Sequence, residues 1–243
     1  MRLVAGFTAA LITMWAGGAS AQAEKWRDAP APKSRAIGIA YARCAVRQSR
    51  AAVREYLADP VGTSDAVKLG RALPSKCLDR AIGGLPFTPS VLKASTLLVR
   101  GLLFEALYAQ DFARLQVALT FEHVPPQKYD VVGVDAAGQT LRHDYRALMK
   151  IGECSARAAP EKVRALLSTV ATSQAEKLAV ADLHDAWTGC LPGHRALQFS
   201  VEMTRATLVE PFYRLLQSRT ATAGAATSND SLVAPNAHKQ AGS

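Results

Sequence analysis

The stretch LVRGLLFEALY (residues 98–108) recurs later in the chain as MTRATLVEPFY (residues 203–213). Both stretches place Arg, Leu, Glu and Tyr in the pattern R-x2-L-x-E-x2-Y. A repeat changes the meaning of every residue inside it, so repetition is the first property to test in this chain.

Two further pairs of segments match in the same order. CAVRQSRAAVREYL (residues 44–57) aligns with CSARAAPEKVRALL (residues 154–167). TSDAVKL (residues 63–69) aligns with TSQAEKL (residues 172–178), and each is followed by a Cys-Leu pair. Three collinear matches predict two copies of one unit: repeat 1 over residues 37–110 and repeat 2 over residues 147–217.

Both copies have the apolar spacing of helices. Between residues 37 and 57 apolar side chains recur three and four positions apart, which predicts one buried stripe. We expect Ser95 and Ser200 to begin the last helix of each copy, and Ser173 with Glu176 to form a capping box. Pro211 lies inside the last helix of repeat 2, which we expect it to bend or interrupt.

The predicted fold class is all-α. Two copies are fewer than an open solenoid needs, so we expect two helical bundles packed as a pseudo-twofold pair. Residues 111–146 are predicted as a connector, in which the alternation of residues 129–134 favours one short strand or hairpin. Residues 22–36 are expected to form a flexible arm. Residues 218–243 are small and polar without periodicity, which predicts a disordered tail.

The first 21 residues have the three parts of a secretory signal peptide. One positive charge at Arg2 precedes an apolar run, and small residues then end at Ala21, the expected cleavage site. The run is shorter than the roughly 20 residues that a membrane-spanning helix needs, so we expect no transmembrane anchor after cleavage. The sequence therefore predicts an exported protein of periplasmic type.

The chain is basic, with 29 Lys and Arg against 20 Asp and Glu and a formal net charge of +9. These residues are scattered, with no basic run and no interleaved aromatic residues, which argues against nucleic acid as the partner. The charge is compatible with an anionic envelope surface, and an envelope protein is the other partner that we consider. Arg54 and Arg164 recur between the copies, and we interpret them as helix-surface groups, with an anion site as the alternative.

Four cysteines follow the predicted signal peptide, two in each copy. An even number of cysteines in an exported chain indicates disulfides, although four cysteines allow three pairings. If each copy is self-contained, the pairs are Cys44 with Cys77 and Cys154 with Cys190. The chain has neither a C-x-x-C pair nor closely spaced Cys and His ligands, so we expect no redox centre, no metal and no cofactor.

The repeated motif contains the candidate site residues. Arg and Glu five positions apart on one helix point in different directions, so each Glu is expected to meet an Arg from another helix in a partly buried ion pair. The alternative places both Glu residues in one cleft as acid and base of a glycan-acting hydrolase, with Tyr and Arg orienting a sugar. The candidates are Glu105, Glu210, Tyr108 and Tyr213 for catalysis, and Arg100 and Arg205 for binding.

The paired-Cys units, with VRALL, CL and VRGLLFEALY, resemble uncharacterised exported bacterial proteins built on the same duplicated helical pattern. The resemblance covers residues 44–213 and implies export and duplication, without implying an activity. From the sequence we therefore expect a non-catalytic exported binding or envelope-associated module, with the glycan-acting hydrolase as the alternative.

Overall fold

The computed structural model describes residues 31–61, 66–82, 96–115, 117–130, 136–191 and 199–230. These residues are mostly helical and contain no β-strand, so the predicted all-α class is confirmed for them. The predicted signal peptide, Ser95 and residues 131–134 lie outside this part of the chain. The helices are α2 (Ala31–Ala58), α3 (Ala66–Ala72), α4 (Ser75–Ile82), α5 (Thr96–Asp111), α6 (Ala136–Ala158), α7 (Pro160–Ser168), α8 (Gln174–Asp182), α9 (His184–Gly189) and α10 (Val201–Asp230).

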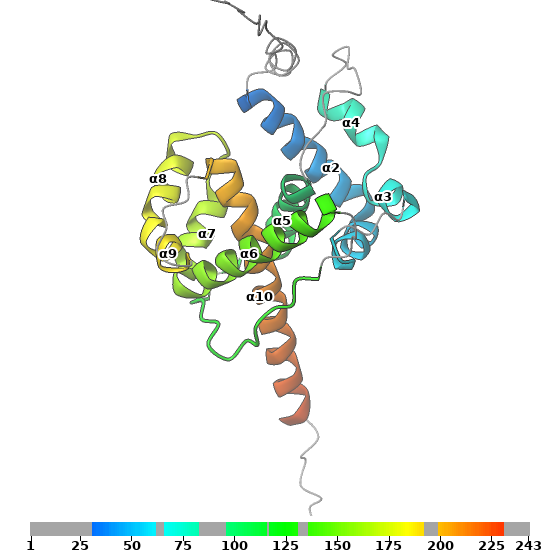
Figure 1. Cartoon of the computed structure of the whole chain (residues 1–243). Coiled ribbons are helices and arrows are strands. Elements are labelled where there is room, and N and C mark those ends of the chain that lie inside the picture. The colour runs from blue at the N-terminus through cyan, green and yellow to red at the C-terminus, as the bar shows by residue number, and fades with distance from the viewer. Residues whose placement is uncertain are drawn as a thin grey trace, which may run out of the picture.

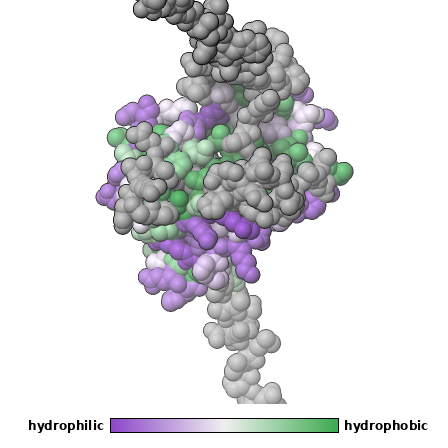
Figure 2. All heavy atoms as spheres, viewed as in Figure 1, coloured by the Kyte–Doolittle hydropathy of each residue, from purple (hydrophilic) through white to green (hydrophobic). Residues whose placement is uncertain are grey.

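Helices α5 and α10 form the centre of the molecule. Figure 1 shows α2, α3 and α4 on one side of this pair and α7, α8 and α9 on the other, while α6 runs across it and packs on α10. Aromatic side chains fill the seam between the central helices: the rings of Phe104 and Tyr213 lie 5.5 Å apart, and those of Tyr108 and Phe212 lie 5.8 Å apart. In the space-filling view, hydrophilic residues cover most of the described surface in the lower part of the body (Figure 2).

The two predicted disulfides are present. Cys44 on α2 pairs with Cys77 on α4, with Cα atoms 5.5 Å apart. Cys154 on α6 pairs with Cys190, which follows α9, with Cα atoms 5.8 Å apart. Each bond therefore joins a long helix to the short helices that follow it, and the pairing expected from self-contained copies is confirmed.

The long helices that carry Cys44 and Cys154 break at matching positions. Inside α2, Ser49 has the non-helical angles φ −140° and ψ 44°. Ala159, between α6 and α7, has φ −141° and ψ 60°. The sequence alignment places Ser49 opposite Ala159. Pro160 then begins α7, where its missing N–H leaves no helical hydrogen bond unmade.

Helix α10 continues through Pro211, so of the two effects expected there, a bend or an interruption, the interruption does not occur. A proline at this position removes the N–H that would bond the carbonyl of Thr207, four residues earlier. Gly152 of α6 packs against this carbonyl so closely that a Cβ atom on Gly152 would overlap the oxygen. The absence of a side chain at Gly152 therefore lets α6 cover the part of α10 that Pro211 weakens.

Three predicted irregular segments are partly helical. Helix α2 already begins at Ala31, inside the expected arm, and α6 begins at Ala136, inside the expected connector. Helix α10 extends to Asp230, inside the expected tail. The tail is rich in alanine, the strongest helix former, and this propensity outweighs its lack of apolar periodicity.

The described part of the connector is irregular and is held by side-chain contacts. Arg157 donates to the carbonyls of Phe121 at 2.7 Å and Val124 at 2.9 Å. The N–H of Val61 donates to the carbonyl of Asp130 at 3.0 Å. None of the described helices combines the length and apolarity that crossing a bilayer requires.

Candidate functional site

The repeated Arg and Glu residues form two ion pairs between the central helices. Arg100 of α5 donates to both oxygens of Glu210 on α10, at 3.0 and 3.3 Å. Arg205 of α10 donates to both oxygens of Glu105 on α5, at 2.9 and 2.9 Å. Each glutamate thus meets an arginine from another helix, as the sequence pattern led us to expect, and the two helices exchange equivalent pairs.

Glu210 is enclosed by donors. Besides Arg100, it accepts from the Tyr145 hydroxyl at 2.7 Å and from Arg214 at 2.8 Å, and its side chain is 1% exposed. Burial alone would raise the pKa of this carboxyl, but the charge and hydrogen bonds of Arg100, with Arg214 and Tyr145, outweigh burial and lower it. Glu210 is therefore a stable carboxylate at neutral pH and has no proton to give as a general acid.

The space beside the Glu210 cluster is small. A cavity of about 50 Å³ is lined by residues that include Arg100, Tyr145 and Arg214, but not by Glu210 itself. That volume holds a few water molecules and excludes a sugar ring. This arrangement gives no support to the hypothesis that Glu105 and Glu210 act together on a glycan.

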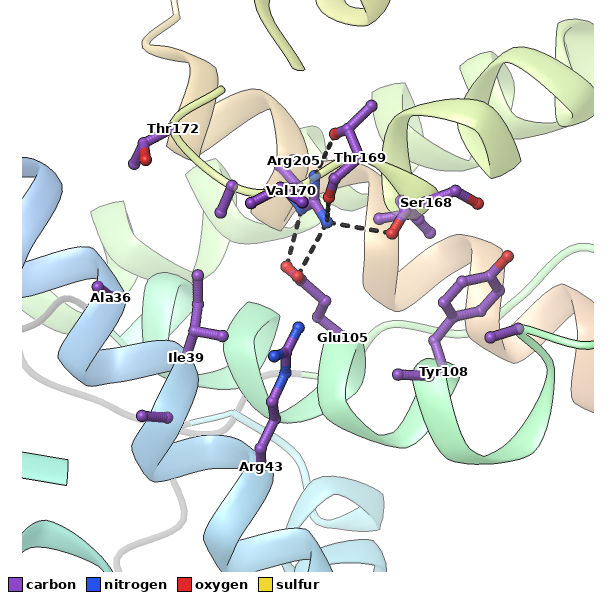
Figure 3. A pocket seen from close by; sticks show the side chains of 15 residues that line it. Ala36, Ile39, Arg43, Glu105, Tyr108, Ser168, Thr169, Val170, Thr172 and Arg205 are labelled. Atoms are coloured by element: carbon purple, nitrogen blue, oxygen red, sulfur yellow. Dashed lines mark hydrogen bonds and ion pairs between the residues drawn. The ribbon is translucent and has the colours of Figure 1, made fainter. Parts of the chain in front are cut away.

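A much larger pocket of about 420 Å³ lies beside Glu105, between α2, α5 and the turn that joins α7 to α8. We call it the α2–α5 pocket (Figure 3). Its polar and charged lining residues are Arg43, Glu105, Tyr108, Ser168, Thr169, Thr172 and Arg205. The rest of the lining is apolar and mostly small: Ala36, Ile39, Ala40, Ala109, Ala113, Leu167, Val170 and Ala171. Three of the six candidate residues therefore line one pocket, whereas Arg100, Glu210 and Tyr213 do not.

Arg205 has a structural role at this pocket. Its two bonds to Glu105 are joined by one to Glu176 at 3.1 Å. Its remaining partners are the carbonyls of Leu166, Leu167 and Thr169 and the hydroxyl of Thr169. These acceptors engage all five N–H groups of the guanidinium, so Arg205 has no free donor for a ligand.

The wall opposite α5 is a strained turn. Thr172 has φ 67°, in the left-handed region that β-branched residues rarely occupy. Its N–H donates to Glu176 at 2.8 Å, and Glu176 is in turn held by Arg35 at 2.5 and 2.9 Å. Ser173 caps α8 by accepting from the N–H of Glu176 at 3.1 Å, which is one half of the predicted capping box; the N–H of Ser173 itself donates to the carbonyl of Val170 instead of to Glu176. Strain of this kind persists only where surrounding contacts fix the backbone, so the turn is a rigid wall.

The two candidate tyrosines have different surroundings. Tyr108 lines the α2–α5 pocket, and burial raises the pKa of its hydroxyl. Tyr213 instead donates to Asp111 at 2.6 Å, and Asp111 also binds Arg54 at 2.6 Å and contacts Arg50. Tyr213 thus belongs to a separate ion-pair cluster, and Arg54 binds a carboxylate of the protein itself.

Sequence reasoning missed Arg43. This side chain is exposed, reaches from α2 into the pocket (Figure 3), and has no hydrogen-bond or ion-pair partner among the described residues. The sequence contains a pattern that could have pointed to Arg43. Arginines at positions 43, 47, 50 and 54 have the spacing of one helix face.

In the described ranges, no group of three or more His, Cys, Asp and Glu side chains is placed to hold a metal ion. Comparisons with known protein families, curated proteins and solved structures found no match to this chain.

Proposed function

We propose that this protein is a non-catalytic binding module of the periplasm, made of two tandem repeats, with its ligand site in the α2–α5 pocket. The observation that carries the proposal is the pocket itself. Its volume of about 420 Å³ is within the range of ligand sites, and one wall is the rigid turn at Thr172. A mixed lining of apolar groups and a few fixed polar groups suits recognition of a small ligand or a peptide segment.

Export is supported by the cysteines. All four form disulfides, which persist in oxidising compartments and are rare in the cytosol. The predicted signal peptide agrees with this compartment. The periplasm is the site we propose because the resemblance is to exported bacterial proteins.

The pseudo-twofold arrangement is supported by features that recur at aligned positions. The two ion pairs are exchanged between α5 and α10. Arg100 and Arg205 also donate to aligned carbonyls, those of Leu57 and Leu167. The matching breaks at Ser49 and Ala159 add a backbone feature that is independent of side chains.

Binding without catalysis is supported by the state of the charged groups. Arg205 neutralises Glu105 through both carboxylate oxygens. Glu210 is buried and ionised, outside the pocket lining. A general acid or base needs a proton-exchanging group in contact with substrate, and these two carboxylates are instead committed to joining the helices.

The proposal is tested by NMR titration of the mature protein with a library of small fragments and short peptides. We expect ligands to shift the resonances of Ala109, Thr169 and Val170, at the pocket. Ala40→Trp places a large ring in the pocket from the exposed face of α2, and it should abolish these shifts. Shifts elsewhere only, or shifts that Ala40→Trp leaves unchanged, would contradict the proposed site.

A further inference from the structure

Two pairs of arginines on α2 differ in whether a described carboxylate binds them. Arg50 and Arg54 are one turn apart and both bind the carboxylate of Asp111, whose side chain is 5% exposed. Arg43 and Arg47 have the same spacing and are both exposed, but neither has a hydrogen-bond or ion-pair partner in the described part of the chain. Like charges one turn apart repel, and an anion between them would relieve that repulsion.

One member of this pair lines the pocket, and Arg47 follows it one turn later on α2. Arg43 is part of the lining, and Figure 3 shows the guanidinium directed into the same space as Glu105. Since Arg205 balances the charge of Glu105, Arg43 leaves the lining with a net positive charge. The pocket therefore favours an anionic ligand, and the internal contact of Asp111 shows that a carboxylate fits two arginines at this spacing.

The uncharged residues that line the pocket indicate which groups a ligand carries besides its anionic group. Ser168 donates its hydroxyl hydrogen to the carbonyl of Arg164 at 2.8 Å, and Thr169 donates its own to Leu166 at 2.7 Å. These oxygens can then only accept from a ligand, that of Thr169 through the lone pair that Arg205 leaves open, which favours a ligand with donors such as amide N–H groups. The alanines of α2 and α5 add an apolar surface with room for small side chains.

We propose that the α2–α5 pocket binds the carboxylate end of a peptide with small side chains, and that Arg43 and Arg47 bind its carboxylate as Arg50 and Arg54 bind Asp111. This inference rests on the proposed function and names the ligand class of the same pocket. A peptide end supplies the three matching features together: a carboxylate, amide N–H groups and small apolar side chains.

The test is calorimetric titration of the mature protein with N-acetyl-trialanine that has either a free or an amidated C-terminus. We expect the amidated peptide to bind about tenfold more weakly, since it loses a charge-assisted hydrogen bond. Arg43→Gln with Arg47→Gln should weaken the free-carboxylate peptide by a similar factor and leave the amidated peptide unchanged. Lys150→Gln, which removes an exposed charge on α6, is the matched control and should leave both affinities unchanged.

Equal affinity for the two peptides, or no effect of the double arginine variant, would overturn the inference. If Ala40→Trp still abolished binding in that case, the pocket would remain the site and only the ligand class would be wrong. Inorganic phosphate and vesicles that contain phosphatidylglycerol are the further probes. Binding of either without binding of the free-carboxylate peptide would assign the arginines to phosphate and overturn the peptide assignment.

Discussion

Gly101 on α5 lies directly against Ala206 on α10. A Cβ atom added to Gly101 would lie 2.7 Å from the Cβ and 2.9 Å from the Cα of Ala206. These residues follow Arg100 and Arg205, so the two helices come closest beside the exchanged ion pairs. The close approach brings each arginine within reach of the glutamate on the opposite helix.

Gly101→Ala should destabilise the protein by about 1–3 kcal/mol, because the added methyl group meets backbone that cannot move aside. Denaturant unfolding gives this value directly. Gly70→Ala is the control, since a Cβ atom there has no atom within 4 Å and alanine favours the helix. Exchanging the two residues, in Gly101→Ala with Ala206→Gly, should recover part of the loss. An unchanged stability of Gly101→Ala would mean that the helices are not in this contact.

Thr172→Gly should raise the free energy of unfolding by about 1 kcal/mol, because glycine adopts φ 67° without the steric cost that threonine pays. Thr172→Ala also removes the side chain but keeps the strain, so it should give no such gain. Thermal unfolding of the two variants side by side separates the backbone effect from the loss of the hydroxyl. Equal stability of the two variants would contradict a strained turn.

Removing either disulfide should cost roughly 4 kcal/mol by loop-closure entropy. The two loops are nearly equal, with a sequence separation of 33 for Cys44 and Cys77 and of 36 for Cys154 and Cys190. The variants Cys44→Ser with Cys77→Ser, and Cys154→Ser with Cys190→Ser, should therefore lose similar stability in urea. A pair whose removal costs nothing would not be a structural bond.

Stability should fall as the pH rises from 10 to 12, partly through Tyr213. Burial, with the hydrogen bond to Asp111, raises the pKa of Tyr213 from 10.0 to about 12. A group whose pKa is raised on folding contributes stability that is complete below pH 10 and is lost as the pH approaches 12. Tyr213→Phe should show a shallower decline over this range, measured by unfolding at each pH. A decline equal to that of the wild type would exclude Tyr213 as its source.

The repeated motif and the aligned cysteines predicted the fold class and the disulfides, because both depend on patterns that recur along the chain. The helical extension to Asp230 and the continuity through Pro211 were not predicted. The first follows from alanine propensity without an apolar stripe, and the second depends on Gly152 from another helix. Local propensity decided the first feature and tertiary packing the second.

The candidate site was predicted only in part. Arg205 and Glu105 were singled out, but their place beside a pocket depends on the turn at Thr172, whose backbone angle no local pattern indicates. Arg43 belongs to a visible row of arginines. Arg43 has no partner among the described residues while Arg54 has one, because Asp111 lies at the end of α5.

The exchanged ion pairs indicate that the repeated glutamates hold the two central helices together. The most direct test is denaturant unfolding of Glu210→Gln beside Glu122→Gln, an exposed glutamate, across acidic and neutral pH. The pKa of Glu210 is lowered from 4.5 on folding, so its contribution is present above pH 4.5 and is lost as the pH falls below that value.

We predict that Glu210→Gln loses about 3–5 kcal/mol at neutral pH, since Arg100 is left buried without its charge partner. Its stability should also depend less on acid than that of the wild type, whereas Glu122→Gln should resemble the wild type. Unchanged or increased stability of Glu210→Gln would contradict this structural role and mean that the carboxylate is kept for something other than the fold.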